Sequence, residues 1–292
     1  MKSFANLVDV KCNICRSEDR EIITELDIGN VVRCNKCRLF YRNPRLSDVD
    51  EISKYRDQDY EDSLCPSLHE SRKEIFVTGL KKLESFKGKI LDIGCSDGFF
   101  LKLAQQRGWK TYGIEISNFF LRRARKKLGD EHVFDVPLRM IKFKSNFFDV
   151  ITMWDVLDQL TDPLGELIEI KRILKRGGLL AVRVRNMSFQ LMVESLFKKT
   201  LLGIVRSPST FHLYGFNNRN IKAILKKAHF SKIKVENSRL TTGDPYGQIR
   251  LYKNFSKNLV KKMYWFFSVF IGLLTFKNLL ISPSIIVYAE KT

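Results

Sequence analysis

One stretch of the chain restricts its possible folds more than any other. Residues 89–100 read KILDIGCSDGFF. The first five residues predict a short buried strand, Gly94 and Gly98 predict a tight turn, and the apolar spacing that follows predicts a helix. A strand, a glycine-rich turn and a helix form the opening unit of a doubly wound α/β sheet, in which ligands bind beyond the carboxyl ends of the strands. The two glycines would let the backbone approach such a ligand closely.

A second unit follows directly. Residues 110–116 read KTYGIEI and predict a strand that ends in an acid, and Ser117 can cap the next helix. The two oxygens of Glu115 suit two ribose hydroxyls, and we expect this carboxylate to lie at the surface and to contribute little to stability. A nicotinamide-dependent dehydrogenase shares these features. The turn GCSDG does not have the spacing G-x-G-x-x-G, so the dehydrogenase is kept only as an alternative.

Four segments, in order, resemble the motifs of class I S-adenosylmethionine-dependent methyltransferases. Residues 92–98 resemble the first motif, Glu115 the ribose-binding acid, residues 147–163 the fourth-strand motif, and residues 174–184 the turn into the fifth strand. The resemblance implies a Rossmann-like, mostly parallel sheet of seven strands, with S-adenosylmethionine as cofactor. The cofactor-binding residues that it implies are Asp92, Gly94, Cys95, Gly98, Glu115, Ile116, Asp135, Trp154 and Asp155.

Some roles implied by the resemblance remain open. Asp135, after the expected third strand, could reach the adenine amine or be a solvated loop acid. The family often has Glu-His after the fourth strand, where this chain has Asp158 and Gln159. His212 stands where similar enzymes carry a histidine on the substrate side, and its unperturbed pKa suits a general base. A purely structural hydrogen bond is the alternative for His212.

Two CxxC pairs predict a metal site near the N-terminus. Cys12 and Cys15 form the first pair, eighteen residues intervene, and Cys34 and Cys37 form the second. This spacing is typical of structural zinc, because four thiolates close a tetrahedron and leave no open position. Four buried free thiols are the alternative reading. A module this small has little core of its own, so the metal itself would hold it folded.

The residues after the second pair extend the resemblance. Residues 38–45, RLFYRNPR, and Tyr55 are similar to the zinc-ribbon leader that precedes many bacterial methyltransferases of surface-polysaccharide clusters. Arg16 and Arg38 directly follow the two CxxC pairs, at the position where such a cysteine turn, or zinc knuckle, often has glycine. The expected organisation is a zinc-ribbon module over residues 1–45, a helical linker over 46–86 and a methyltransferase domain over 87–292.

Charge is unevenly distributed along the chain. The 292 residues carry a formal net charge of +19, and residues 198–292 hold 17 basic and 3 acidic side chains. Such a basic region favours an anionic partner, either nucleic acid, a phosphorylated substrate or an acidic membrane surface. The N-terminal residues do not have the pattern of a signal peptide, and we expect a cytoplasmic protein, either free or bound at the periphery of the membrane.

Two apolar insertions interrupt the α/β alternation, at about residues 187–213 and 250–281. The second contains Lys253, Lys257, Lys261 and Lys262 and the uncharged run 263–276, too short to cross a bilayer, and precedes a last strand at 284–290. It is expected to be a helical lid over the substrate pocket or a helix on an anionic membrane surface.

The function expected from the sequence is methyl transfer to a hydroxyl or carbon acceptor on a sugar, glycan or lipid-linked intermediate of polysaccharide biosynthesis. No [DNS]PP[YF] sequence follows the fourth strand, which argues against methylation of an exocyclic amine of DNA. The alternatives are a protein that binds or modifies RNA through the ribbon and the basic half, and a cofactor-binding protein without turnover. The expected partner is a small-molecule or glycan acceptor, with nucleic acid disfavoured.

Overall fold

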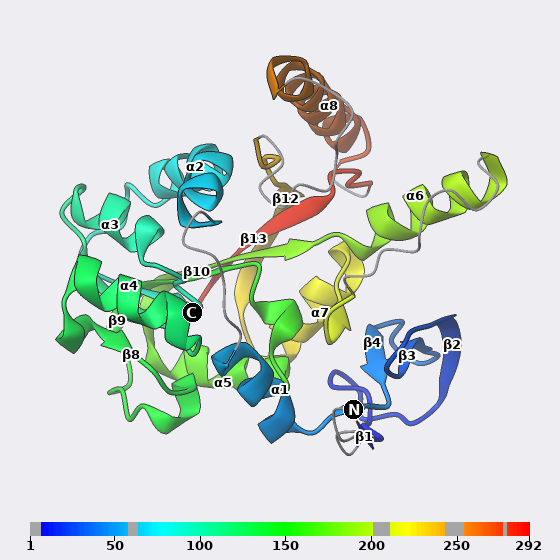
Figure 1. Ribbon diagram of the computed structural model, residues 1–292, viewed down its shortest axis with the longest axis horizontal. Helices are drawn as coiled ribbons and strands as arrows, with labels where there is room; N and C mark the ends of the chain where they lie inside the picture. Colours follow the sequence, from blue (N-terminus) through cyan, green and yellow to red (C-terminus); the bar gives the residue numbers. More distant parts are fainter. Residues whose placement is uncertain (1–6, 58–63, 201–210, 243–253, 277–278) are drawn as a thin grey trace.

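The computed structural model describes residues 7–57, 64–200, 211–242, 254–276 and 279–292. Its centre is a seven-stranded sheet in the order β12-β13-β10-β9-β6-β7-β8 (Figure 1). Strand β13 runs antiparallel to both neighbours, whereas β8, β7, β6, β9 and β10 pair in parallel. The doubly wound sheet with an antiparallel last strand is therefore confirmed. Its strands are β6 (Lys89–Ile93), β7 (Lys110–Ile114), β8 (Val133–Phe134), β9 (Phe148–Trp154), β10 (Leu174–Arg185), β12 (Ser231–Asn237) and β13 (Ser284–Glu290).

Helices cover both faces of this sheet. Neighbouring residues of one strand enter different layers, since Ile90 packs with α2, α3 and α4 whereas Leu91 packs with α5 and α7. The sheet is thus apolar on both faces, as in other parallel sheets. The helices are α2 (Leu64–Lys82), α3 (Phe99–Gln105), α4 (Asn118–Leu128), α5 (Pro163–Ile173) and α7 (Asn218–Lys227).

The N-terminal leader forms a second sheet that includes a strand from the main domain. Its order is β11-β4-β3-β2, and β11 lies about 170 residues after β4 in the chain, in the connection that leads to α7. Cys12, Leu39 and Tyr41 belong to the same buried cluster as Leu213 and Phe216. The leader therefore has more core than expected, because it shares the core of the main domain. Its elements are β1 (Leu7–Val8), β2 (Arg20–Glu25), β3 (Asn30–Cys34), β4 (Phe40–Asn43), β5 (Arg45–Leu46), α1 (Asp48–Arg56) and β11 (Tyr214–Gly215).

Each of the two insertions contains one long helix. The first begins with α6 (Met187–Thr200), and its residues 201–210 lie outside the described residues. The second contains α8 (Asn254–Leu274), which lies beyond the end of β12, at the periphery of the molecule (Figure 1). Lys253 lies outside the described residues. Within the described ranges, no helix is both long enough and apolar enough to cross a membrane.

Candidate functional site

The turn after β6 has a backbone that only small residues permit. Gly94 and Gly98 have φ values of +72° and +79°, in the left-handed region that favours glycine. A Cβ at Gly94 would lie 2.4 Å from Cγ2 of Val156, and one at Gly98 would lie 2.8 Å from Cδ1 of Leu128. The glycines therefore let the turn lie close to the end of β9 and to α4.

Glu115, just after β7, holds this turn. Its Oε2 accepts a hydrogen bond from the backbone N–H of Ser96, and its Oε1 accepts one from Ser117, both at 2.8 Å. Burial raises the pKa of Glu115. The expectation of a surface carboxylate was wrong, because Glu115 is only 9% exposed and is bound to two backbone amides. Each oxygen still keeps a lone pair that can accept a ribose hydroxyl.

Asp92 lies inside the sheet. It is 1% exposed, and the hydroxyl of Thr152 donates to its Oδ1 at 2.6 Å, which ties β6 to β9. Burial raises the pKa of Asp92 well above its usual range. Cys95 is also buried, and a Cβ at Gly113 would lie 2.7 Å from its Sγ. These residues shape the floor of the turn, and direct contact of Asp92 and Cys95 with a cofactor stays a prediction.

The turn after β6 is also bonded to α2, through Asp97. Asp97 Oδ2 lies 2.6 Å from Nε2 of His69 and accepts a hydrogen bond from Nζ of Lys127 at 2.6 Å. Burial opposes the charge on Asp97, but these two bonds bring its pKa below the usual value. The His69 ring also stacks on Phe99, with centroids 4.1 Å apart. Sequence reasoning missed His69, because a lone histidine on a helix carries no signal of a partner.

Two further predicted cofactor contacts are Ile116 and Asp135. Ile116 is half-buried between Glu115 and the start of α4. Asp135, just after β8, is half-exposed and lies 3.4 Å from the guanidinium of Arg125. Its carbonyl oxygen accepts from Arg56 of α1 at 3.2 Å, so the chain after β8 is tied to the leader. Contact of Ile116 or Asp135 with the cofactor stays a prediction.

Trp154 is the last residue of β9 and Asp155 follows it, and the two side chains have different surroundings. The Trp154 ring packs edge-on against Phe76 and Phe100, between α2, α3 and the sheet. The structure gives it a packing role, and contact with a cofactor stays a prediction.

Asp155 has a left-handed φ of 62°, and its Oδ2 accepts from Nη1 of Arg183. The guanidinium of Arg72 lies 3.7 Å from the same oxygen, whereas the buried Oδ1 finds no hydrogen-bond partner among the described residues. Arg183 was not identified from the sequence, although a charge that interrupts the apolar run of residues 179–184 was an available signal.

The segment that contains His212 lies beside the loop that follows β9. The N–H of Leu213 donates to the carbonyl oxygen of Asp158 at 3.1 Å, and the Tyr214 hydroxyl donates to that of Thr161 at 3.1 Å. His212 itself is half-buried. It therefore belongs to the segment that borders this loop, at the carboxyl edge of the sheet, and its role as a base stays a prediction.

Asp158 is buried in the same loop. Its Oδ2 lies 3.4 Å from Nε of Arg185, the last residue of β10. Burial raises the pKa of Asp158 to about 6, although Arg185 opposes the rise. The carboxyl ends of β9 and β10 thus carry two carboxylates, Asp155 and Asp158, each beside an arginine of β10.

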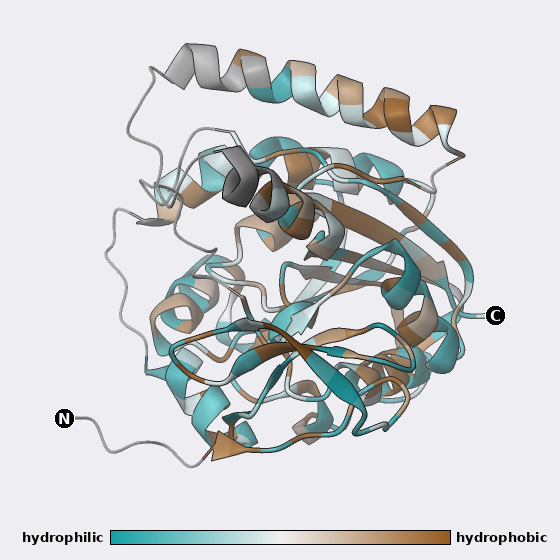
Figure 2. Ribbon diagram, turned by 90° about the vertical axis from the view of Figure 1, so that its right-hand side faces the viewer, coloured by the Kyte–Doolittle hydropathy of each residue, from teal (hydrophilic) through white to brown (hydrophobic). Residues whose placement is uncertain are grey.

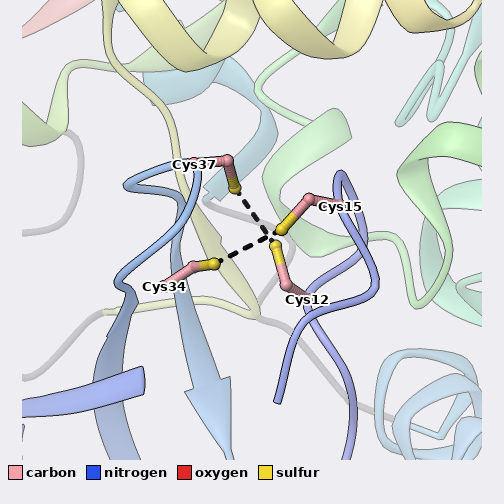
Figure 3. Close-up of side chains that lie close together, drawn as sticks. All are labelled: Cys12, Cys15, Cys34 and Cys37. Atoms are coloured by element: carbon pink, nitrogen blue, oxygen red, sulfur yellow. Dashed lines mark hydrogen bonds between the residues drawn. The ribbon is translucent and has the colours of Figure 1, made fainter. Parts of the chain in front are cut away.

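The four leader cysteines converge as the spacing predicted (Figure 3). The Sγ atoms of Cys12, Cys15, Cys34 and Cys37 all lie within 4.8 Å of one another, with the pairs Cys12–Cys37 and Cys15–Cys34 at 3.3 and 3.4 Å. In a tetrahedral zinc site with Zn–S bonds of about 2.3 Å, the sulfurs are about 3.8 Å apart. The donor set and its spacing fit a structural zinc ion.

Both cysteine turns keep their shape with arginine in place of glycine. Arg16 and Arg38 have φ values of 61° and 64°. Their N–H groups donate to the carbonyl oxygens of Cys12 and Cys34 at 2.8 and 2.9 Å. The departure from glycine therefore leaves the two knuckles equivalent, at the cost of a left-handed conformation that is unfavourable by about 1 kcal/mol per residue.

Comparison with known proteins assigns the central part of the chain to a protein family. The family model described as "Methyltransferase domain" matches residues 63–235. An uncharacterized methyltransferase of Schizosaccharomyces pombe is 27% identical, over 57% of this chain and 66% of the relative. The tRNA U34 carboxymethyltransferase of Vibrio cholerae is 27% identical, over 52% of this chain and 48% of the relative. The chain thus spans about half to two thirds of the length of these curated relatives.

A solved structure agrees with the fold. The S-adenosylmethionine-dependent methyltransferase, possible histamine N-methyltransferase, of Thermotoga maritima superposes with a TM-score of 0.51 at 17% identity. The alignment covers 77% of this chain and 92% of that protein. At this identity the likeness concerns the α/β fold alone.

Proposed function

The chain belongs to the methyltransferase-domain family through residues 63–235, and from this premise we propose that it transfers the methyl group of S-adenosylmethionine to a hydroxyl or carbon acceptor. The acceptor is a sugar, glycan or lipid-linked intermediate of polysaccharide biosynthesis. The observation that carries the proposal is the carboxyl edge of the sheet, where Gly94 and Gly98 form a left-handed turn and Glu115 accepts a hydrogen bond from the backbone of this turn. Resemblance of the leader to those of polysaccharide-cluster enzymes supports the acceptor class.

The methyl group of a sulfonium is already activated, so the protein mainly has to orient the acceptor and remove a proton. Glu115 would accept the ribose hydroxyls, through the lone pair that remains on each of its oxygens. Asp155 and Asp158 offer hydrogen-bond acceptors that suit a hydroxylated acceptor at the ends of β9 and β10. His212 is the candidate base. Zinc at the four cysteines would supply structural support and take no part in the transfer.

Labelled methyl transfer tests this proposal. The protein is incubated with methyl-tritiated S-adenosylmethionine and, separately, a bacterial glycolipid extract, nucleotide sugars and RNA. Label in the glycolipid or sugar fraction is expected, and label in none of them overturns the proposal. Gly94→Val is the background control, because its side chain would collide with Val156 and close the turn. His212→Gln should lower kcat while leaving cofactor affinity unchanged.

RNA is the second candidate acceptor. It is favoured by the similarity to a tRNA-modifying enzyme and by the net charge of +19. Binding to RNA should weaken steeply with salt, because each phosphate contact releases a counterion. Transfer to a neutral sugar should change little over the same range. Peripheral contact with an anionic membrane is part of the first proposal, since a lipid-linked acceptor resides there.

A further inference from the structure

Helix α8 is apolar on two opposite sides, and only one of them is covered. The outer side repeats at helical spacing, and each of its side chains is more than half exposed. These residues are Leu259, Met263, Phe266, Phe267, Phe270, Leu273 and Leu274. Phe276, just after the helix, is 89% exposed. Figure 2 shows α8 along one side of the molecule, with hydrophobic residues concentrated in its C-terminal part. An apolar surface of this kind marks an interaction site.

The inner side of α8 is held firmly by the body of the protein. The Tyr264 hydroxyl donates to the carbonyl oxygen of Ile281 at 2.5 Å, and Nδ2 of Asn237 donates to that of Ser268 at 2.6 Å. The guanidinium of Arg239 lies 4.5 Å from the centre of the Trp265 ring. These contacts fix the rotation of the helix, so the outer side faces away from the protein.

We propose that the outer face of α8 docks this protein onto an anionic membrane surface, with the helix lying in the plane of the interface. The charge of the helix fits this partner, because residues 254–274 contain three lysines and no acidic residue. Lys262 is exposed and lies one helical turn from Phe266, where its ammonium can reach lipid headgroups while the aromatic rings enter the acyl region. Lys262 and the aromatic rings therefore lie on the same surface, whereas Lys261 is turned toward the protein and donates to the carbonyl oxygen of Thr241 at 3.0 Å.

A second copy of the chain suits this face less well. Each copy carries a net charge of +19, and 14 of these charges are the excess of residues 198–292, which include α8. Two such faces would repel one another, whereas anionic lipid attracts both. The exposed aromatic side chains of this face, with Lys262 beside them, also fit interfacial helices, which combine an aromatic side with basic residues.

The docked helix would lie next to a cavity, one of whose lining residues is joined by hydrogen bonds to the proposed methyl-transfer site. A cavity of about 320 Å³ lies beneath α8, and its lining is mostly apolar, with Trp265 and Val269 from the helix and Ile286 from β13. Ser238 lines it as well, and its hydroxyl accepts from Nε of Arg183, whose guanidinium also reaches Asp155. This step rests on the proposed lipid-linked acceptor, whose chain the apolar cavity would accommodate beside the membrane.

Vesicle co-sedimentation tests the docking directly. The zinc-loaded full chain is mixed with vesicles of phosphatidylcholine alone, or with about one third phosphatidylglycerol added, and sedimented. Wild type is expected in the pellet with the anionic vesicles and largely in the supernatant with the neutral ones. Phe266→Ser/Phe270→Ser should lower the partition coefficient at least about tenfold. Lys262→Gln should lower it about fivefold, and only for anionic vesicles.

The matched control removes equally exposed hydrophobic residues elsewhere. Ile22 on β2 and Met140 beyond β8 are 62% and 69% exposed, and Ile22→Ser/Met140→Ser should bind vesicles as wild type does. Wild type that stays in the supernatant with both vesicles, or an outer-face variant that sediments like wild type, overturns the proposal. A dimer in analytical ultracentrifugation that Phe266→Ser/Phe270→Ser converts to monomer, without vesicle binding, assigns the face to a second copy instead.

Two further measurements distinguish a loss of membrane docking from misfolding of a variant and from a failure of the proposed methyl transfer. Circular dichroism of each variant confirms folding, which is expected because the changed side chains are exposed. Calorimetric affinity for S-adenosylmethionine should be the same in all variants. Failure of vesicle binding with retained methyl transfer would therefore reject the membrane surface alone, and loss of methyl transfer with retained vesicle binding would reject the proposed function alone.

Discussion

Asn13→Ala tests whether the first cysteine knuckle is fastened to the methyltransferase domain. Asn13 lies between Cys12 and Cys15, and its side chain is buried against the start of α5. Its Nδ2 donates to Oδ1 of Asp162 at 2.9 Å, and its Oδ1 accepts from the N–H of Leu164 at 2.9 Å. Alanine removes both bonds and leaves the cysteines in place.

The size of the effect follows from these two bonds. A hydrogen bond to a charged group contributes about 1.5 to 3 kcal/mol and a neutral one about 0.5 to 1.5 kcal/mol. Asn13→Ala should therefore lower the free energy of unfolding by about 2 to 4 kcal/mol. Asn35 is the matched control, because it holds the same place in the second knuckle but is exposed and donates only to Asp19, at 2.7 Å. Asn35→Ala should cost less than about 1 kcal/mol.

Urea unfolding of the zinc-loaded proteins measures both effects. Tryptophan fluorescence reports the main domain, where Trp154 is buried against Phe76 and Phe100. The midpoint should fall for Asn13→Ala with an unchanged m-value, since a change in m would indicate a different denatured state. Equal losses for the two variants, or no loss for Asn13→Ala, would refute the idea that the first knuckle is fastened to α5.

The remaining predictions concern the cofactor edge, pH and zinc. Glu115→Ala should weaken S-adenosylmethionine binding at least about tenfold in calorimetry and lower stability by about 3 kcal/mol or more, because two backbone N–H groups lose a charged acceptor; unchanged affinity removes Glu115 from the site. Burial raises the pKa of Asp158 to about 6 from 3.8, so the folded state binds this proton more tightly than the unfolded chain. The stabilising contribution of protonated Asp158 should therefore be lost, by about 3 kcal/mol, as pH rises from about 4 to about 6, and a stability profile that Asp158→Asn leaves unchanged contradicts this. Metal analysis should find about one zinc per chain, and chelation should speed amide exchange at residues 211–216 as well as in the leader; exchange confined to residues 12–45 would show that β4 and β11 are not coupled.

The parts of the fold that were predictable depend on local patterns. Residues 89–100, 110–116 and 284–290 each carry a strand signal beside a turn or a helix signal, and all three strands form as expected. The cysteine cluster was predictable for the same reason, because a CxxC turn brings two sulfurs together without help from the rest of the chain. A four-cysteine site also requires that the two CxxC turns lie next to each other, and the short strands β2 and β3 between them bring this about.

The parts that were not predictable depend on contacts between distant residues. Strand β11 is two residues long and pairs with β4 across about 170 residues, and a segment so short has no periodicity to read. The burial of Glu115 depends on Ser96, which the turn after β6 brings to it. The apolar run of α8 was visible in the sequence, but the side that faces outward is set by contacts such as that between Arg239 and Trp265.

The leader meets the main domain at the loop that follows β9, and this position gives the cysteine cluster a connection to the site. Asn13 binds the end of this loop through Asp162, and β4 pairs with β11, whose neighbour Leu213 binds the carbonyl of Asp158. The same loop begins at Asp155, which Arg183 contacts at the carboxyl edge of the sheet. The leader is therefore joined to this loop at two points, through Asn13 at Asp162 and through β4 and β11 at Asp158. Because packed elements transmit small displacements, we expect changes at the four cysteines to displace Asp155 and Asp158, although these cysteines lie outside the site.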